Sequence, residues 1–201
     1  MEFRLTYEGA LYVHQDSRRL PQRNAHVHSI RKEFHKQLDV LWRSHPILLE
    51  LKSKPPEYSQ PPRPPTLQIF PHDKFNWLPI VNTGNGLICK LDILLLRTGP
   101  PGGVMADIDN RVKTIFDALR KASGPWELRT NTGELCPDPV TEDPFYVLLE
   151  DDKLITHVSV TSDMLLEQVA KPDVAPENAV RLVISVTVRP YMPYTETVGY
   201  A

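Results

Sequence analysis

Residues 87–97, LICKLDILLLR, and residues 106–124, ADIDNRVKTIFDALRKASG, decide the fold of this chain. The first stretch is nearly continuous in its apolar content and predicts a buried strand. In the second, apolar residues recur at i, i+3, i+4 and i+7 from Val112 to Leu119, which predicts a helix over 110–121. A Gly-Pro-Pro-Gly-Gly loop separates the two, so the centre of the chain reads as strand, loop and helix.

Further strands are predicted at both ends of the chain. Residues 1–13 alternate apolar and polar side chains around a predicted turn at Glu8-Gly9. Residues 155–161 and 179–189 also alternate, which is typical of strands with one buried face.

A second amphipathic helix is predicted over 27–43, because apolar residues recur there at helical spacing and Pro46 follows. Residues 164–170, MLLEQVA, predict a short helix between the last two strands. Residues 54–65, KPPEYSQPPRPP, predict an extended connector, since proline fixes φ and removes backbone donors.

We expect one domain over 1–201, with an N-terminal extension over 1–66 and an insertion over 123–150.

Composition excludes several classes of protein. With 41% hydrophobic residues and a formal net charge of −2, the chain is not disordered throughout. Cys89 and Cys136 lie far apart, which excludes a disulfide scaffold and a cysteine-rich zinc site. No stretch predicts a membrane span or a signal peptide, so we expect a cytoplasmic protein with no membrane partner.

Charge is unevenly distributed along the chain. Residues 1–66 hold 11 basic and 7 acidic residues, whereas 134–179 hold 2 basic and 11 acidic ones. The basic part suits contact with a polyanion, and ordinary variation in surface charge explains the pattern equally well.

Acidic residues and one lysine gather around the predicted central helix and the strand after it. They are Asp107, Asp109, Lys113, Asp117, Asp151 and Asp152. If the strand at 155–161 pairs beside the start of the helix, three or four carboxylates converge around one lysine. Like charges this close need compensation, and Mg²⁺, which prefers carboxylate oxygens, would supply it and support phosphoryl chemistry.

Each of these residues also has an ordinary structural interpretation. Asp109 suits a helix N-cap, and Lys113 with Asp117 suits an ion pair on a helix surface. Asp151-Asp152 suits a turn. The pair His26 and His28 is expected at the surface rather than on a metal.

The string ADIDNRVKTIFDALRKA, followed by LLEDDKLITHVSV and a final alternating strand, resembles the RusA family of Holliday-junction resolvases. The family pattern is D-x-D-N-x-x-K-x-x-x-D-A-L, then an acidic doublet before a strand. The matching residues are Asp107, Asp109, Asn110, Lys113, Asp117, Ala118, Leu119, Asp151 and Asp152. The resemblance covers roughly residues 87–189, with a longer interval between helix and doublet than is typical of the family.

The resemblance implies a RusA-like α/β (α+β) fold, a small mixed sheet with helices packed on one face. It also implies a homodimer and Mg²⁺-dependent cutting of four-way DNA junctions, with Mn²⁺ as a substitute metal. It makes Asp107, Asp109 and Asp152 the metal ligands and catalytic carboxylates, with Lys113 as the catalytic basic residue near the scissile phosphate.

Other residues receive supporting roles. The resemblance implies that Asp151, Asp117 and Asn110 lie behind the metal ligands, with Asp117 as the candidate to orient Lys113. Candidates for contact with DNA are Arg111, Arg31, Lys32 and Lys36. Two other functions stay open: a DNA-binding module of the same fold that does not cleave, and a structural or interaction protein whose acidic face is merely solvated.

Overall fold

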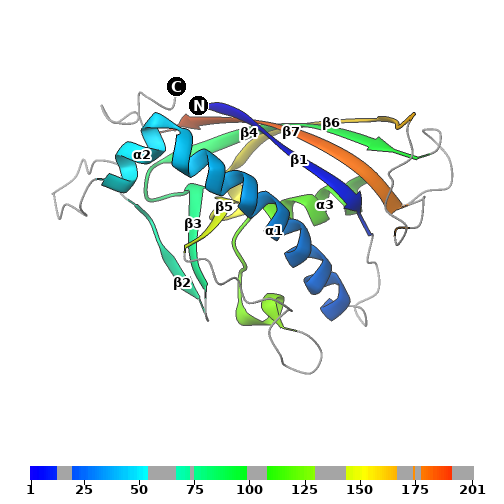
Figure 1. The fold of residues 1–201 in the computed structure, drawn as a ribbon, viewed down its shortest axis with the longest axis horizontal. Helices are drawn as coiled ribbons and strands as arrows, with labels where there is room; N and C mark the ends of the chain where they lie inside the picture. Colours follow the sequence, from blue (N-terminus) through cyan, green and yellow to red (C-terminus); the bar gives the residue numbers. More distant parts are fainter. Residues whose placement is uncertain are drawn as a thin grey trace.

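The computed structural model describes residues 1–12, 20–53, 67–72, 75–98, 108–129, 144–166, 174 and 178–191. Its elements in chain order are β1 (Glu2–Ala10), α1 (Leu20–Ser44), α2 (Pro46–Ser53), β2 (Phe70–His72), β3 (Phe75–Val81), β4 (Leu87–Arg97), α3 (Ile108–Leu119), η2 (Pro125–Leu128), β5 (Phe145–Leu149), η3 (Asp152–Leu154), β6 (Ile155–Met164) and β7 (Ala179–Pro190) (Figure 1). The predicted α+β class is confirmed. The predicted connector 54–65 and Asp107 lie outside the described residues.

The larger sheet has four strands in the order β1-β7-β4-β6. β7 is antiparallel to both of its neighbours, and β6 runs parallel to β4. On β4, every second side chain is buried, including Leu91, Ile93 and Leu95, because successive residues of a strand point to opposite faces. The sheet therefore has one buried face and one face toward solvent, and β4 has the bounds that the sequence predicted.

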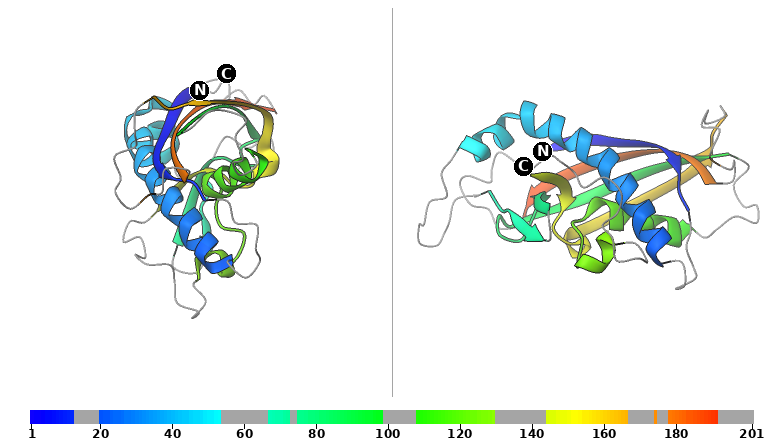
Figure 2. Two further views of the ribbon diagram at one scale, coloured as in Figure 1. Left: turned by 90° about the vertical axis from the view of Figure 1, so that its right-hand side faces the viewer. Right: turned by 60° about the horizontal axis from the view of Figure 1, so that its bottom comes forward.

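Helices α1 and α3 lie on the buried face. Seen end-on in Figure 2, the sheet curves around α3, and α1 runs along its β1 side. The inward residues of α1 include Ile30, Phe34 and Leu38, none more than 1% exposed. Burying one such side chain stabilises a fold by about 1.5–3 kcal/mol. This stripe holds α1 against the sheet, and the helix is longer than the predicted 27–43.

A second sheet, β2-β3-β5, was not predicted. β3 and β5 are parallel, and their residues Trp77 and Phe145 belong to a separate aromatic core. His28 of α1 packs between Phe75 and Phe145 and is 1% exposed. The expectation that His28 lies at the surface is therefore wrong, because the helix face that carries it covers this small sheet.

The N-terminal segment is part of the core, not an extension added to it. β1 pairs with β7 over nine residues without interruption, so the predicted turn at Glu8-Gly9 does not form. The long neighbouring strand β7 keeps β1 extended. The amino group of Met1 also donates to the carbonyl of Val188 at 3.0 Å.

The segment predicted as a short helix over 164–170 begins as the end of a strand. β6 continues as a strand through Met164, which pairs with Arg97 at the end of β4. Pairing with the full length of β4 outweighs the weak helical pattern here. Residues 167–170 lie outside the described part of the chain.

Candidate active site

The exposed residues of α3 are few and lie at its first two turns. All twelve residues of the helix are described, and only Ile108, Asp109 and Lys113 are exposed. Its remaining turns bury Ile115 and Leu119 in the main core. Asp109 and Lys113 stand at i and i+4, which places them side by side on the helix surface. α3 therefore presents one carboxylate and one ammonium group to solvent at its N-terminal end.

Local hydrogen bonds fix the start of this helix. The Oδ1 atom of Asp109 accepts a hydrogen bond from the backbone N–H of Asn110 at 2.8 Å. The half-buried Asn110 accepts one at its carbonyl from the Thr114 hydroxyl at 3.1 Å. A carboxylate in the first turn is also stabilised by the positive end of the helix dipole. Asp109 thus suits a carboxylate oxygen ligand, and Asn110 supports the turn behind it.

Two arginines lie beneath this end of α3. Arg111 is 1% exposed and donates from Nη1 to the carbonyl of Leu11 at 3.2 Å. Burial lowers the pKa of Arg111, and the charge of Arg97 at the end of β4 lowers it further. The expected contact of Arg111 with DNA is corrected, because its guanidinium is enclosed. Its charge nevertheless adds to that of Arg97 at the start of α3.

Asp117 belongs to an ion network at the other end of the helix. It binds Arg23 of α1, and its Oδ1 accepts from Arg120 Nη2 at 2.7 Å. Arg120 also pairs with Glu127 of η2 at 3.0 Å. Burial acts to lower the pKa of Arg120, but the hydrogen bond and charge of Glu127 and the charge of Asp117 raise it. Asp117 therefore joins α1 and α3 and, contrary to expectation, does not orient Lys113.

The basic residues expected to contact DNA from α1 differ in exposure. Arg31 is 1% exposed and donates to the backbone carbonyls of Arg120 and Asp117 at 3.0 and 2.6 Å. Its predicted contact with DNA is therefore corrected, since it holds the end of α3 instead. Lys32 is half-buried, and the exposed Lys36 pairs with Glu33 at 2.8 Å.

The acidic doublet stands at the start of β6. The side chain of Asp151 caps η3 by accepting from the backbone N–H of Lys153 at 3.0 Å. That hydrogen bond is the main reason why the pKa of Asp151 is lowered. Asp152 is exposed beside it. Asp151 thus has the turn role that its sequence also suggested, while Asp152 is open to a ligand.

The doublet and Asp109 lie at opposite ends of α3. The backbone N–H of Lys121, just past the end of the helix, donates to the carbonyl of Leu149 at 2.9 Å, two residues before the doublet. A helix of twelve residues is about 18 Å long. The condition for convergence, pairing beside the start of the helix, is therefore not met in one chain. No three His, Cys, Asp or Glu side chains of the described residues form a group able to hold a metal ion.

Sequence reasoning missed Arg97. A charged residue that ends an otherwise apolar strand, directly before a glycine-rich loop, was the available signal. In the structure, Arg97 is half-buried and its Nε atom is enclosed without a hydrogen-bond partner in the described part of the chain.

No protein-family model, curated protein or solved structure matches the chain. Within the described ranges, no helix is long and apolar enough to cross a membrane.

Proposed function

We propose that this protein is a Mg²⁺-dependent endonuclease that cuts branched DNA such as four-way junctions, with its active site at the N-terminal end of α3. The observation that carries the proposal is the selective exposure of Asp109 and Lys113 on a helix whose other polar residues are buried or half-buried. A solvated surface helix would expose polar residues along a whole face. The exposed polar residues of α3 are only an aspartate and a lysine, the two types that metal-dependent phosphoryl chemistry uses.

The residues present suit a magnesium ion. Mg²⁺ binds one or two carboxylates and keeps several waters and substrate oxygens as its other ligands. Asp109 supplies one exposed carboxylate, and Asp107, two residues earlier in the sequence, is the proposed second. Bound there, Mg²⁺ would neutralise charge on a phosphoryl oxygen and promote ionisation of water. Mn²⁺ has the same preference for oxygen ligands and is expected to substitute.

The surrounding charges support an anionic substrate. The N-terminal end of a helix attracts phosphate through its free N–H groups and its dipole. The charges of Arg97 and Arg111 reinforce this field. Lys113 is exposed one turn along and has no ion pair within the described residues, so it is available to offset charge that develops on the scissile phosphate. In-line attack by water would leave 5′-phosphate and 3′-hydroxyl ends.

A second candidate function is a DNA-binding module of the same fold that does not cleave. The observation that favours it is the distance between Asp109 and the doublet, which lies past the far end of α3. Such a protein would bind junctions equally well with Mg²⁺ or EDTA and would leave every strand intact.

Cleavage assays separate the two functions. Purified protein is incubated with a four-way junction, a matching linear duplex and a forked duplex, each with Mg²⁺ or EDTA. We expect Mg²⁺-dependent cuts in the junction, lost in Lys113→Met and Asp109→Asn by about 100-fold or more. Asp92→Asn, the same chemical change at an exposed position on the outer face of β4, is the matched control and should cut normally. Binding without cuts in any substrate would favour the second candidate.

A further inference from the structure

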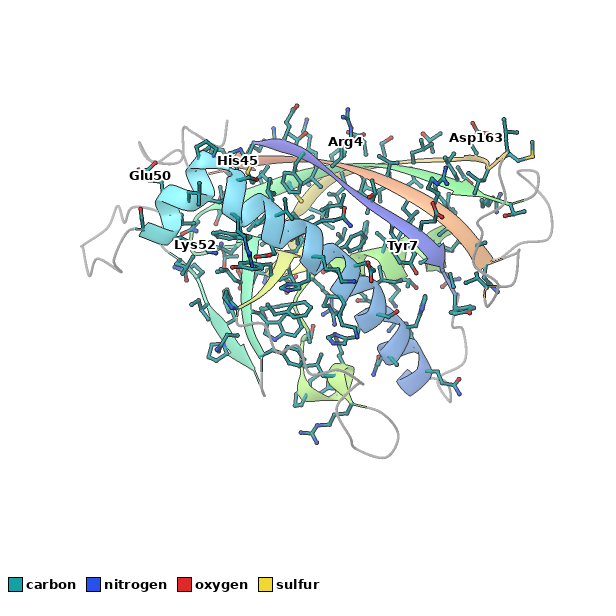
Figure 3. All side chains as sticks on the ribbon, viewed as in Figure 1. Arg4, Tyr7, His45, Glu50, Lys52 and Asp163 are labelled. Carbon is teal, nitrogen blue, oxygen red and sulfur yellow. The ribbon has the colours of Figure 1, made fainter. Side chains whose placement is uncertain are left out.

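One of the three tryptophans of this chain is open to solvent. Trp126, in η2, is 66% exposed, whereas Trp42 and Trp77 are almost completely buried. A cation covers each buried ring: the Nζ atom of Lys52 on α2 lies 5.7 Å from the ring centroid of Trp42 (Figure 3). The Cζ atom of Arg31 lies 5.5 Å from the ring centroid of Trp77. In the part of the chain that the structure describes, no cation or second aromatic ring lies over Trp126, so its indole is available for stacking.

The turn that carries Trp126 is held in place on several sides. Leu128 is 1% exposed and belongs to the aromatic core beside β3 and β5. Glu127 accepts a hydrogen bond from Arg120 Nη2 at 3.0 Å, and the carbonyl of Trp126 accepts one from the side-chain amide of Asn24 at 2.9 Å. Because these contacts already fix the turn, a ligand that binds the indole has little conformational entropy to remove.

Gly124 makes room for the indole. Its φ of −168° is extended backbone that any residue adopts, so the position does not need glycine for its conformation. A Cβ atom here would instead lie 2.1 Å from Cη2 and 2.2 Å from Cζ3 of Trp126. One side of the indole therefore rests on the bare backbone of Gly124 while the ring stays open to solvent elsewhere. Any side chain at this position would push the ring away.

The surroundings of Trp126 carry an excess of positive charge. The ion network beside it contains two carboxylates and three guanidinium groups, those of Asp117, Glu127, Arg23, Arg31 and Arg120. Three positive charges thus share two negative ones. Arg129, directly after η2, is a further exposed basic residue. Such a surface attracts a polyanion.

Proteins that bind unpaired nucleic acid strands combine aromatic rings, on which bases stack, with positive charge along the path of the backbone. Trp126 and the ion network beside it provide both features. A base inside a duplex is already stacked on its neighbours, so only an unpaired base offers a face to the indole. We propose that Trp126 stacks on a base of an unpaired DNA strand, which the positive charge of the network attracts.

This contact lies outside the proposed active site. It rests on the proposed function, because DNA is the ligand, but it does not require cleavage. Trp126 lies past the C-terminal end of α3, and Asp109 lies at the start of that helix. The protein would therefore prefer branched DNA with an unpaired strand, such as a fork, over a continuous duplex.

Fluorescence measures the contact, because Trp126 is the one exposed emitter among the three tryptophans. In EDTA, so that no strand is cut, an oligothymidylate of about 16 nucleotides should quench the wild-type emission. By anisotropy of the labelled oligonucleotide, Trp126→Ala should weaken binding about 5- to 150-fold, and Trp126→Phe, which keeps a ring, should retain most of it. Tyr191→Ala, which removes a 45% exposed aromatic side chain just beyond β7, is the matched control and should bind normally.

Gly124→Ala tests the position of the ring. It leaves Trp126 in the chain but displaces the indole, so it should weaken binding of the oligonucleotide as well. Added to Trp126→Ala, it should have no further effect, because both substitutions act through the same side chain. A full additional loss in the double variant would show that the indole does not carry the effect, which would refute the proposal.

The remaining outcomes separate this contact from the proposed function, provided that circular dichroism shows a wild-type fold. Equal affinity of wild type and Trp126→Ala for the oligonucleotide would overturn the contact, as would an equal loss of affinity for a blunt duplex. Mg²⁺-dependent cuts would still uphold the proposed function in that case. Binding that depends on Trp126 without any cuts would uphold the contact and refute the endonuclease. A wild type that binds no DNA would overturn both.

Discussion

Replacing Asp117 by asparagine tests the assignment of this residue to an ion network instead of to catalysis. The carboxylate is 11% exposed and accepts from Arg23 and Arg120, whose side chains are 21% and 13% exposed. The asparagine keeps the size of the side chain but loses the charge and turns an N–H₂ group toward one guanidinium. Two arginines would then face each other across a side chain that no longer compensates their positive charges.

The expected loss of stability depends on which partners each arginine keeps after the substitution. Removing one partner of a buried ion pair costs about 3–5 kcal/mol, and a hydrogen bond to a charged group contributes about 1.5–3 kcal/mol. Arg120 keeps Glu127 at 3.0 Å, and Arg23 is partly solvated, so both costs are reduced. We therefore expect Asp117→Asn to lower the free energy of unfolding by about 2–3 kcal/mol.

Urea unfolding followed by circular dichroism measures this loss. Asp109→Asn is the matched control, because it makes the same change on the same helix at an exposed position, and it should stay within about 0.5 kcal/mol of wild type. Folded Asp117→Asn should cut DNA at close to the wild-type rate. A variant with wild-type stability and lost cleavage would refute the network and restore Asp117 as the residue that orients Lys113.

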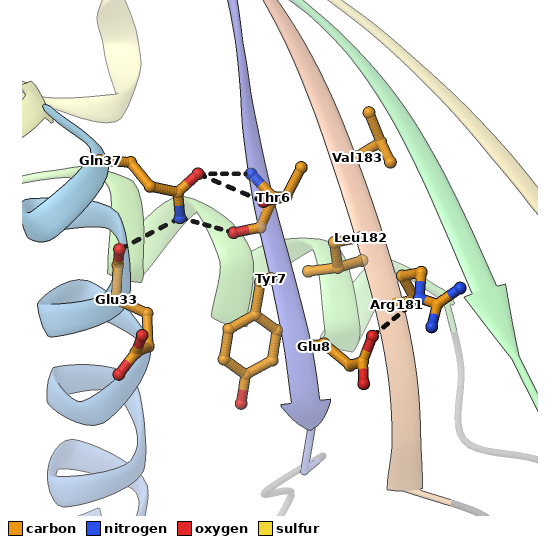
Figure 4. A pocket seen from close by; sticks show the side chains of 8 residues that line it. All are labelled: Thr6, Tyr7, Glu8, Glu33, Gln37, Arg181, Leu182 and Val183. Carbon is orange, nitrogen blue, oxygen red and sulfur yellow. Dashed lines mark hydrogen bonds and ion pairs between the residues drawn. The ribbon is translucent and has the colours of Figure 1, made fainter. Parts of the chain in front are cut away.

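Three further predictions concern stability. Burial lowers the pKa of His28 from 6.5 to about 3, with the charges of Arg31 and Lys32 adding to the effect. The folded state disfavours the protonated imidazole, so burial of neutral His28 favours folding fully above pH 6.5. This contribution to the free energy of unfolding is lost as pH falls toward 3, about 2 kcal/mol of it by pH 5. His28→Phe, which keeps a ring between Phe75 and Phe145, should therefore lose less stability than wild type between pH 7 and pH 5 in urea unfolding, and an equal loss would contradict the assignment. The side-chain amide of Gln37 bonds both backbone groups of Thr6 on β1 (Figure 4), so Gln37→Ala should cost about 1–2 kcal/mol in the same assay. An unchanged unfolding midpoint would show that the amide does not hold β1. Saturating Mg²⁺ should raise Tm, equivalent to about 2.7 kcal/mol at a hundred times its dissociation constant, in wild type and not in Asp109→Asn; equal shifts in both would place the metal elsewhere.

The sequence predicted the central elements well, because their patterns are local. β4 has the predicted bounds, since a nearly continuous apolar stretch ends at Arg97. The helix predicted over 110–121 spans Ile108–Leu119, because its apolar stripe and the residues that end it are local features of the sequence. The last strand, predicted over 179–189, extends by one residue to Pro190.

Elements that depend on distant partners escaped prediction. β3 and β5 are short apolar stretches without alternation, and each is extended because it pairs in parallel with the other, more than 60 residues away. β1 passes through Glu8-Gly9 without turning, because β7 offers it a partner along its whole length.

In the candidate site too, the features encoded by local sequence were predictable and those set by packing were not. Exposure of Asp109 and Lys113 follows from the helical period around buried Ile115, so the sequence could place them together. The burial of Arg31 and Arg111 and the partners of Asp117 depend on how α1 crosses α3. The position of the doublet depends on where β5 ends beside α3, a contact between residues 121 and 149 that no local pattern encodes.

Cleavage of a four-way junction by the wild-type protein tests the proposed endonuclease activity. We expect cuts that need Mg²⁺ or Mn²⁺, carry 5′-phosphate ends, and are lost in Asp109→Asn and Lys113→Met while Asp92→Asn retains them. Cutting by Asp109→Asn at the wild-type rate, or intact junctions after incubation of the folded wild-type protein with Mg²⁺, would contradict it.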